Sequence, residues 1–427
     1  MSAHATPLGL GAEQAETNWS SLVSSLASLE SVRRGFELIS KHKRWINQQH
    51  LEVCRVPAPT FREKQRALHL FEKFSSLGHN PQIDEAGNVV VPLTHAKNLP
   101  FVAVSAHMDT ILAPARPEDV GVRSDGTLEG PGVTDNGPGL SALLALAKVL
   151  DVPLFQDAGR NILLIANVAE EGEGNLQGMR YIAEHSPYAE LIDRYLVVDG
   201  ASTAHITAEA LGSRRFELTI EGHGGHSWND FGRANPVHAL ARAISLMTDA
   251  ALPSNPRATL TVGVIQGGSS INAIPSSARA KIDVRSRDQA TMQRVVEIVE
   301  EATRVAVQHE NRRSTDRLSS YRLRDIGHRP ASAALAVNPM VDCFQAVDRY
   351  LKIQSRMDYA STDANVPLSK GLPAVTVGAG GRGGDAHAPS EWYDPEGREL
   401  GLKRLILALA GLISRDGSFE APGTLSQ

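Results

Sequence analysis

Seven residues that suit acid–base or metal chemistry lie where apolar runs or glycine-rich turns of the sequence end. They are His107, Asp109, Asp135, Glu170, Glu171, Asp199 and His387. Glu170 and Glu171 are adjacent, and two ionised carboxylates beside a buried strand repel each other and lose hydration. Positive charge near them would compensate this cost, and a divalent metal is its simplest source.

The donor types of this set favour zinc. Imidazole and carboxylate ligands without a thiolate suit Zn²⁺, with Mn²⁺ or Co²⁺ as alternatives. One catalytic zinc ordinarily takes about three protein ligands and a water. If five of these seven residues are ligands, they are more than one zinc ion uses. Two ions that share a bridging carboxylate would use five ligands and leave room for a water. The set therefore predicts two Zn²⁺ ions per subunit.

The order of the predicted elements places these residues at one edge of a sheet. Apolar strands at 101–106, 161–167 and 194–199 alternate with helices at 137–150 and 176–185. This alternation is typical of βαβ units, which build a mostly parallel sheet flanked by helices. Ligands of such sheets bind outside the carboxyl ends of the strands, which is where the seven residues fall.

Helices are also expected before the sheet. From Asn18 to Leu51 the apolar positions recur at helical spacing. The stretch 59–78 predicts a further helix with Thr60 as its N-cap, because Glu63 follows three residues later as in a capping box.

The pattern changes near Leu211, where a second module begins. Its elements alternate in the order strand, helix, strand, strand, helix, strand, at 213–222, 235–249, 258–268, 277–286, 288–308 and 317–327. That order predicts an inserted α+β domain of the ferredoxin-like kind. The chain of 427 residues is therefore expected to hold an α/β catalytic domain at 1–211 and 329–427, and the inserted domain at 212–328.

Composition excludes several classes of protein. The chain carries 48 acidic and 43 basic residues, a net charge of −5, and no basic run, so no nucleic-acid partner is expected. No stretch approaches about 18 consecutive apolar residues, so no membrane span is expected. Cys54 and Cys343 lie far apart and make no disulfide framework. Since no secretory signal precedes the first helix, a cytoplasmic protein is expected.

Five segments resemble, in order, the motifs of the dinuclear zinc exopeptidases. That family includes peptidase T, the glutamate carboxypeptidases, the carnosine dipeptidases and aminoacylase. The segments are "SAHMDT" (105–110), "GPGVTDNGPG" (130–139), "NVAEEGEGN" (167–175), "VVDG" (197–200) and "HAPSEW" (387–392). The resemblance extends over about residues 55 to 410 and is closest in motif to the peptidase T-like aminopeptidases. It implies the catalytic domain of that family and, in the inserted domain, its lid.

The resemblance implies the ligands of each metal ion. Asp135 would bridge the two ions. His107 and Asp199 would complete one site, and Glu171 and His387 the other.

It also implies the residues that act beside the metals. Asp109 would orient the imidazole of His107, as carboxylates often do for metal-bound histidines. Glu170 would be the general base, which takes a proton from the bridging water and delivers it to the leaving amine. The peptide bond after Asp135 would be cis, and Asn136 stands where many members have a second Asp.

In the lid, the resemblance implies three substrate-binding residues and a homodimer. His226 would reach into the partner subunit's site and polarise the scissile carbonyl, and Asn272 would bind substrate. Arg285 would hold a substrate carboxylate, a task that suits a guanidinium. A surface arginine at a sheet edge is the alternative for Arg285.

The predicted function is a zinc-dependent hydrolase that cleaves amide bonds of short peptides, of aminopeptidase, dipeptidase or tripeptidase type. Asp199 favours a peptidase, since the family tends to have Asp there in aminopeptidases and dipeptidases and Glu in carboxypeptidases and deacylases. An amidohydrolase of N-acyl or N-carbamoyl amino acids is the alternative. An inactive, metal-stabilised peptide-binding scaffold is a remote one, because it should have lost the base or a ligand.

Overall fold

The computed structural model describes residues 9–94, 96–150, 158–318 and 320–414. The chain divides into two compact units. The first comprises the residues up to Ala208 and those from Ala334 onward, and the second is Glu209–Ala333. The domain boundaries expected after residues 211 and 328 differ from these limits by a few residues.

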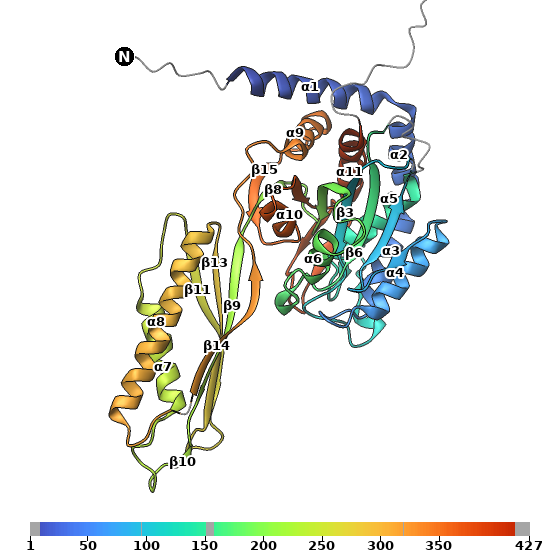
Figure 1. Cartoon of the computed structure of the whole chain (residues 1–427). Helices are drawn as coiled ribbons and strands as arrows, with labels where there is room; N and C mark the ends of the chain where they lie inside the picture. The colour runs from blue at the N-terminus through green and yellow to red at the C-terminus, as the bar shows by residue number, and fades with distance from the viewer. Residues whose placement is uncertain (1–8, 95, 151–157, 319, 415–427) are drawn as a thin grey trace, which may run out of the picture. The chain divides into compact units, whose positions relative to one another are not determined.

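An eight-stranded sheet forms the centre of the first unit (Figure 1). Its strands are β1 (Gln82–Ile83), β2 (Val89–Leu93), β3 (Phe101–His107), β6 (Asn161–Asn167), β7 (Ile192–Val198), β8 (His205–Ala210), β15 (Arg356–Ala360) and β16 (Ala374–Val377). They follow the order β1-β2-β6-β3-β7-β16-β8-β15. The central strands β6, β3, β7 and β16 are parallel, whereas β2 and β8 attach antiparallel on either side. The predicted α/β fold with a mostly parallel sheet is confirmed.

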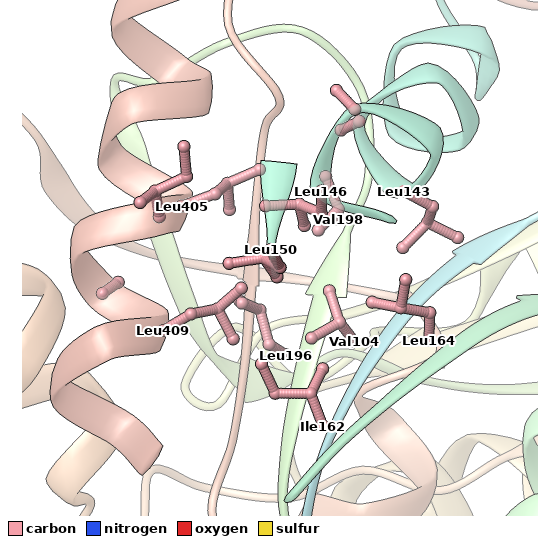
Figure 2. Close-up of a cluster of buried hydrophobic side chains, with 14 of the residues drawn as sticks. Val104, Leu143, Leu146, Leu150, Ile162, Leu164, Leu196, Val198, Leu405 and Leu409 are labelled. Carbon is pink, nitrogen blue, oxygen red and sulfur yellow. The ribbon is translucent and has the colours of Figure 1, made fainter. Parts of the chain in front are cut away.

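Two helices bury one face of this sheet. Leu146 of α5 (Gly137–Val149) and Leu409 of α11 (Arg398–Ile413) lie in one buried cluster with Val104 of β3, as Figure 2 shows. The strands β3 and β6 are buried along their whole length, as expected where helices cover both faces. The helix α11 was not predicted.

Among the described residues, four helices precede the sheet, with bounds α1 (Gly9–Ser28), α2 (Glu30–Lys41), α3 (Lys43–Arg55) and α4 (Lys64–Ser76). The helical region expected from Asn18 to Leu51 is broken at Leu29, whose ψ of 137° is extended, and again at His42. The N-cap predicted at Thr60 is wrong. The helix α4 begins at Lys64, and the Thr60 hydroxyl donates to Asp109 instead.

The second unit is a four-stranded antiparallel sheet with two helices on one face (Figure 1). In chain order its elements are β9 (Gly212–Glu221), α7 (Pro236–Asp249), β11 (Ala258–Gly267), β13 (Ser277–Ser286), α8 (Gln289–Arg313) and β14 (Ser320–Arg329). The strands are arranged β11-β13-β9-β14. This is the ferredoxin-like arrangement that the sequence predicts. The side chain of Asn235 caps α7 by accepting the N–H groups of Val237 and His238.

Smaller elements complete both units. They are β4 (Gly121–Val122), β5 (Leu128–Glu129), α6 (Gln177–Glu184), β10 (Gly225–His226), β12 (Ala273–Ile274), α9 (Pro339–Leu351), α10 (Asn365–Ser369), β17 (Arg382–Gly384) and β18 (Trp392–Asp394). The first unit has a second sheet in the order β17-β18-β5-β4, and β10 pairs with β12 in the second unit. None of the helices in the described part of the chain has the length and apolar character that crossing a membrane requires.

Candidate metal centre

The predicted ligands of the first unit lie at the carboxyl edge of the central sheet. His107 ends β3, and Glu171 and Asp199 follow β6 and β7. Asp135 lies in the turn before α5, and His387 lies in the loop between β17 and β18. Parallel neighbours bring their carboxyl ends to the same edge, so residues far apart in sequence meet there.

The carboxylate of Asp135 lies between the two imidazoles. Its Oδ1 is 2.9 Å from Nε2 of His107, and its Oδ2 is 3.0 Å from Nε2 of His387. The N-cap of α5 is Asn136, which accepts the N–H of Gly139, so both oxygens of Asp135 remain directed at the imidazoles. The Asp135–Asn136 peptide bond is cis, as the resemblance implies.

The other two carboxylates lie on either side of this bridge. Glu171 Oε1 is 2.7 Å from Nε2 of His387, and Asp199 Oδ1 is 3.7 Å from Nε2 of His107. Ligand atoms of His107, Asp135 and Glu171 all lie within 4.8 Å of one another. The geometry thus brings together all five residues predicted as ligands.

Asp109 is buried and forms hydrogen bonds with residues on both sides of the centre. Its backbone oxygen lies 3.0 Å from Nδ1 of His107, which leaves Nε2 directed at Asp135. Its carboxylate accepts the backbone N–H of Glu170 through Oδ1 at 3.0 Å and that of Glu171 through Oδ2 at 2.9 Å. The adjacent pair of glutamates is therefore held by a third carboxylate through the backbone.

The cluster has too little positive charge of its own. Burial lowers the pKa of His107, but its contacts with Asp109, Asp135 and Asp199 outweigh burial and raise that pKa well above its ordinary value. Hydrogen bonds to Asp135 and Glu171 raise the pKa of His387 to about 10. Imidazoles that hold protons so strongly face more carboxylate charge than they can balance. The nitrogen and oxygen donors of this cluster therefore fit a divalent metal.

Asn136 ties the turn before α5 to the strand that leads to Asp199. Its side-chain N–H donates to the carbonyl of Val198 at 2.9 Å, and its Oδ1 accepts the N–H of Gly200 at 3.2 Å. An ionised Asp could not donate to Val198. Asn136 thus fixes the spacing between Asp135 and Asp199.

Glu391 is a site residue to which the sequence analysis assigned no role. Its carboxylate accepts three backbone N–H groups, those of Gly132 at 2.9 Å, Thr134 at 2.7 Å and Asp135 at 3.0 Å. Burial raises the pKa of Glu391, and these three donors oppose the rise. Its place in the "HAPSEW" motif, four residues after His387, was the available signal.

Residues near the start of α4 also brace the centre. Thr60 donates to Asp109 Oδ2 at 2.9 Å, and Glu63 accepts the N–H of Ala169 at 3.0 Å. The buried Arg66 donates to the carbonyl of Met108 at 2.6 Å. These side chains connect the segment before the sheet with the strand ends that carry the candidate ligands.

Cys54 also contacts one of the motifs, although it is distant from all of them in sequence. Its buried thiol donates to the carbonyl of Gly132 at 3.3 Å. Cys54 therefore packs beneath the turn that carries Asp135.

The predicted residues of the second unit do not all lie together. His226 on β10 pairs with Ala273 on β12, and the N–H of Ser227 donates to the carbonyl of Asn272 at 3.0 Å. Arg285 lies near the other end of β13, and it forms an ion pair with Asp283 at 2.7 Å. His226 and Asn272 are thus neighbours, whereas Arg285 is separated from them by most of the length of β13.

A hollow of about 380 Å³ opens beside Asp199 in the first unit. Its lining includes the polar residues Ser202, His205 and Thr362. The hollow offers room for a polar group next to the candidate ligand Asp199.

Two protein-family models match the chain. The model described as peptidase dimerisation domain matches residues 209–310, and the model described as peptidase family M28 matches residues 88–235. These matches confirm the predicted resemblance to the metallo-exopeptidases.

Curated relatives include both a deacylase and a peptidase. Succinyl-diaminopimelate desuccinylase of Paracoccus denitrificans is 30% identical over 181 residues, which cover 40% of this chain and 47% of that protein. Cytosol non-specific dipeptidase of Escherichia coli is 27% identical over 263 residues, which cover 55% of this chain and 52% of that protein. The chain spans about half to two thirds of the length of the curated relatives it matches.

Solved structures show the same fold. The aminopeptidase PepT from Bacillus cereus superposes with a TM-score of 0.66 at 17% identity, over 86% of this chain and 98% of that one. At this level of identity the likeness concerns the fold, that is, an α/β unit with a mostly parallel sheet and an inserted dimerisation domain.

Proposed function

We propose that the chain is a metal-dependent hydrolase of amide bonds in short peptides, because it matches the model of a peptidase dimerisation domain and has the fold of a solved aminopeptidase. The single observation that carries this proposal is the position of Asp135. Its two oxygens face Nε2 of His107 and Nε2 of His387, an arrangement in which one carboxylate would serve two metal ions.

The five donors divide naturally between two ions. His107 and Asp199 would hold one ion, Glu171 and His387 the other, and Asp135 both. Two imidazoles and three carboxylates without a thiolate suit Zn²⁺. Divalent ions held in this way polarise a substrate carbonyl and make a water acidic near neutral pH.

We assign the proton transfer to Glu170. It is buried, with 4% of its surface exposed, and its backbone is fixed by the carboxylate of Asp109. A carboxylate beside the ligand Glu171 can accept a proton from the attacking water and deliver it to the leaving amine. The adjacent glutamates thus have separate roles, since Glu171 binds metal and Glu170 handles the proton.

A free peptide is the substrate class that we favour. The relative from Escherichia coli is named as a dipeptidase, and Asp at position 199 is the residue that aminopeptidases and dipeptidases of this kind tend to have. The hollow beside Asp199 gives space for polar parts of a short peptide. The relative named as a desuccinylase supports an N-acyl amino acid as the second candidate substrate.

The second unit would complete the enzyme as a homodimer. The match to a dimerisation domain over 209–310 supports this assembly. We assign to His226 the task of polarising the scissile carbonyl in the partner subunit's site, and to Asn272 on the neighbouring strand a contact with substrate. Arg285 would hold a substrate carboxylate only if it left Asp283, its present partner. The cytosolic relative supports a cytoplasmic location.

A substrate panel on metal-loaded protein tests the proposed function. The panel contains free dipeptides, free tripeptides, and N-acyl and N-carbamoyl amino acids. Peptides with a free amino terminus should have the highest kcat/KM. A preference for acylated amino acids would support the deacylase instead, and hydrolysis of none would favour the inactive scaffold.

A further inference from the structure

A buried carboxyl group of the first unit has no role in the centre described above. Asp363 lies just before α10, with 1% of its surface exposed. Its Oδ2 accepts one hydrogen bond, from the side-chain N–H of Asn167 at 2.7 Å. Its Oδ1 and the Oδ1 of Asn167 are both buried without a hydrogen-bond partner in the described part of the chain.

Asn167 places this pair beside the candidate metal centre. It is the last residue of β6, and it lies next to His107 of β3 in the parallel register. Its carbonyl accepts the N–H of Met108 at 2.7 Å. Three residues further along the chain lies Glu170. The pair thus lies at the carboxyl edge of the sheet, where β3 and β6 deliver their candidate ligands.

Without a cation nearby, the buried carboxylate of Asp363 lowers the stability of the folded protein. A buried carboxylate needs an ion pair or several hydrogen bonds, and Asp363 has one hydrogen bond and no ion pair within the described residues. The pKa of Asp363 is raised to about 7, chiefly by burial; Asp199 and Asp109 add to the rise, and His107 and Asn167 oppose it. These neighbours belong to the centre, so the charge of Asp363 and the charge of the centre act on each other.

We infer that Asp363, held by Asn167, is a positioning residue that strengthens cation binding at the centre at the expense of the stability of the metal-free protein. The inference rests on the proposed function, because it takes the centre as a metal site. A negative charge in a buried setting attracts a divalent cation more strongly than it would in water. Without the cation, the same charge lies among other carboxylates.

Asp363→Asn separates this role from a purely structural one. The amide keeps the shape of the side chain and removes its charge. It also supplies an N–H donor, which the unused acceptor Oδ1 of Asn167 can accept. The metal-free variant should unfold at the same or a higher urea concentration than the wild type. Its affinity for Zn²⁺, measured by competition with a chromogenic chelator, should fall about 10–100-fold, as for other residues that support metal ligands.

Asp348→Asn is the matched control. Asp348 is equally buried in the first unit, but both of its oxygens accept from the buried Arg404 at 2.6 Å. Its loss should destabilise the metal-free protein and leave the Zn²⁺ affinity of the folded protein unchanged. At saturation with Co²⁺, the visible absorption of Asp363→Asn should equal that of the wild type, because the ligands themselves are intact.

The outcomes distinguish this inference from the proposed function. If the wild type binds Zn²⁺ tightly and Asp363→Asn binds it equally tightly, the inference is wrong and the proposed function stands. If Asp363→Asn is destabilised as Asp348→Asn is, Asp363 is a structural residue. If the wild type binds no divalent metal at all, the proposed function and this inference are both wrong.

Discussion

Glu391 accepts the backbone N–H of Asp135 through Oε1 at 3.0 Å. The same carboxylate holds Gly132 and Thr134, so one buried side chain fixes the turn that presents Asp135, the proposed bridging ligand. Glu391→Gln keeps the size of the side chain but leaves one oxygen for three donors. An unpaired buried donor costs about 1–3 kcal/mol, so the free energy of unfolding should fall by that amount in urea titrations.

The substitution Glu391→Gln should also leave the carboxylate of Asp135 less firmly positioned. We expect the Zn²⁺ affinity of Glu391→Gln to fall about 10–100-fold. Glu396→Gln is the control, because Glu396 is exposed and forms an ion pair with the exposed Arg382. Equal effects of the two substitutions would show that Glu391 does not support the centre.

Glu170→Gln should abolish most of the activity while the fold and the metal content remain. Removal of a general base typically costs about 10²–10⁴-fold in rate, and the loss should appear in kcat. Glu173→Gln is the control, since Glu173 lies three residues away and is exposed. Retention of more than half of the wild-type kcat in Glu170→Gln would remove this residue as the base.

His387 should make the stability of the metal-free protein depend on pH. Its pKa is raised by Asp135 and Glu171 to about 10, above the value of about 6.5 expected in the unfolded chain. A group with a raised pKa stabilises the fold fully below the unfolded value, and that stability is lost as the pH rises through the folded value.

Chelator-treated protein should therefore lose free energy of unfolding from about pH 6.5 to about pH 10. The loss should be smaller in His387→Gln, which lacks the titrating group. Parallel curves for the two proteins in urea titrations across this range would contradict the contacts assigned to His387.

The proposed role of His226 across a dimer predicts complementation between two inactive variants. His226→Ala retains its own Glu170, and Glu170→Gln retains His226 for its partner. In an equal mixture that exchanges subunits, half of the dimers are mixed and each has one intact site, so about a quarter of the wild-type activity should return. A mixture of Glu170→Gln with the double variant provides the control. If the first mixture recovers no more activity than the control, His226 does not act on the partner's site.

The residues to which we assign the chemistry could be picked out from the sequence because each follows an apolar strand or a glycine-rich turn. His107, Glu171 and Asp199 could be placed at one edge of the sheet from the alternation of strands and helices alone. The structure adds the distances, above all the position of Asp135 between two imidazoles that are separated by 280 residues of sequence.

The supporting residues were harder to predict, because they act through contacts that are distant in sequence. Thr60 and Glu63 have the spacing of a capping box, but they bond Asp109 and Ala169 instead, because tertiary contacts override the local signal. The breaks at Leu29 and His42 leave the helical spacing of the apolar residues intact and so escape detection. Nothing near Asp363 in the sequence indicates that it meets Asn167.

The central claim is that Asp135 bridges two metal ions, and the metal content of the intact protein tests it most directly. Protein dialysed against metal-replete and then metal-free buffer should retain about two equivalents of Zn²⁺ per chain, measured by native mass spectrometry. Asp135→Ala, if folded, should retain less than one. A wild type that holds less than one equivalent, or an Asp135→Ala variant that still holds two, would contradict the account.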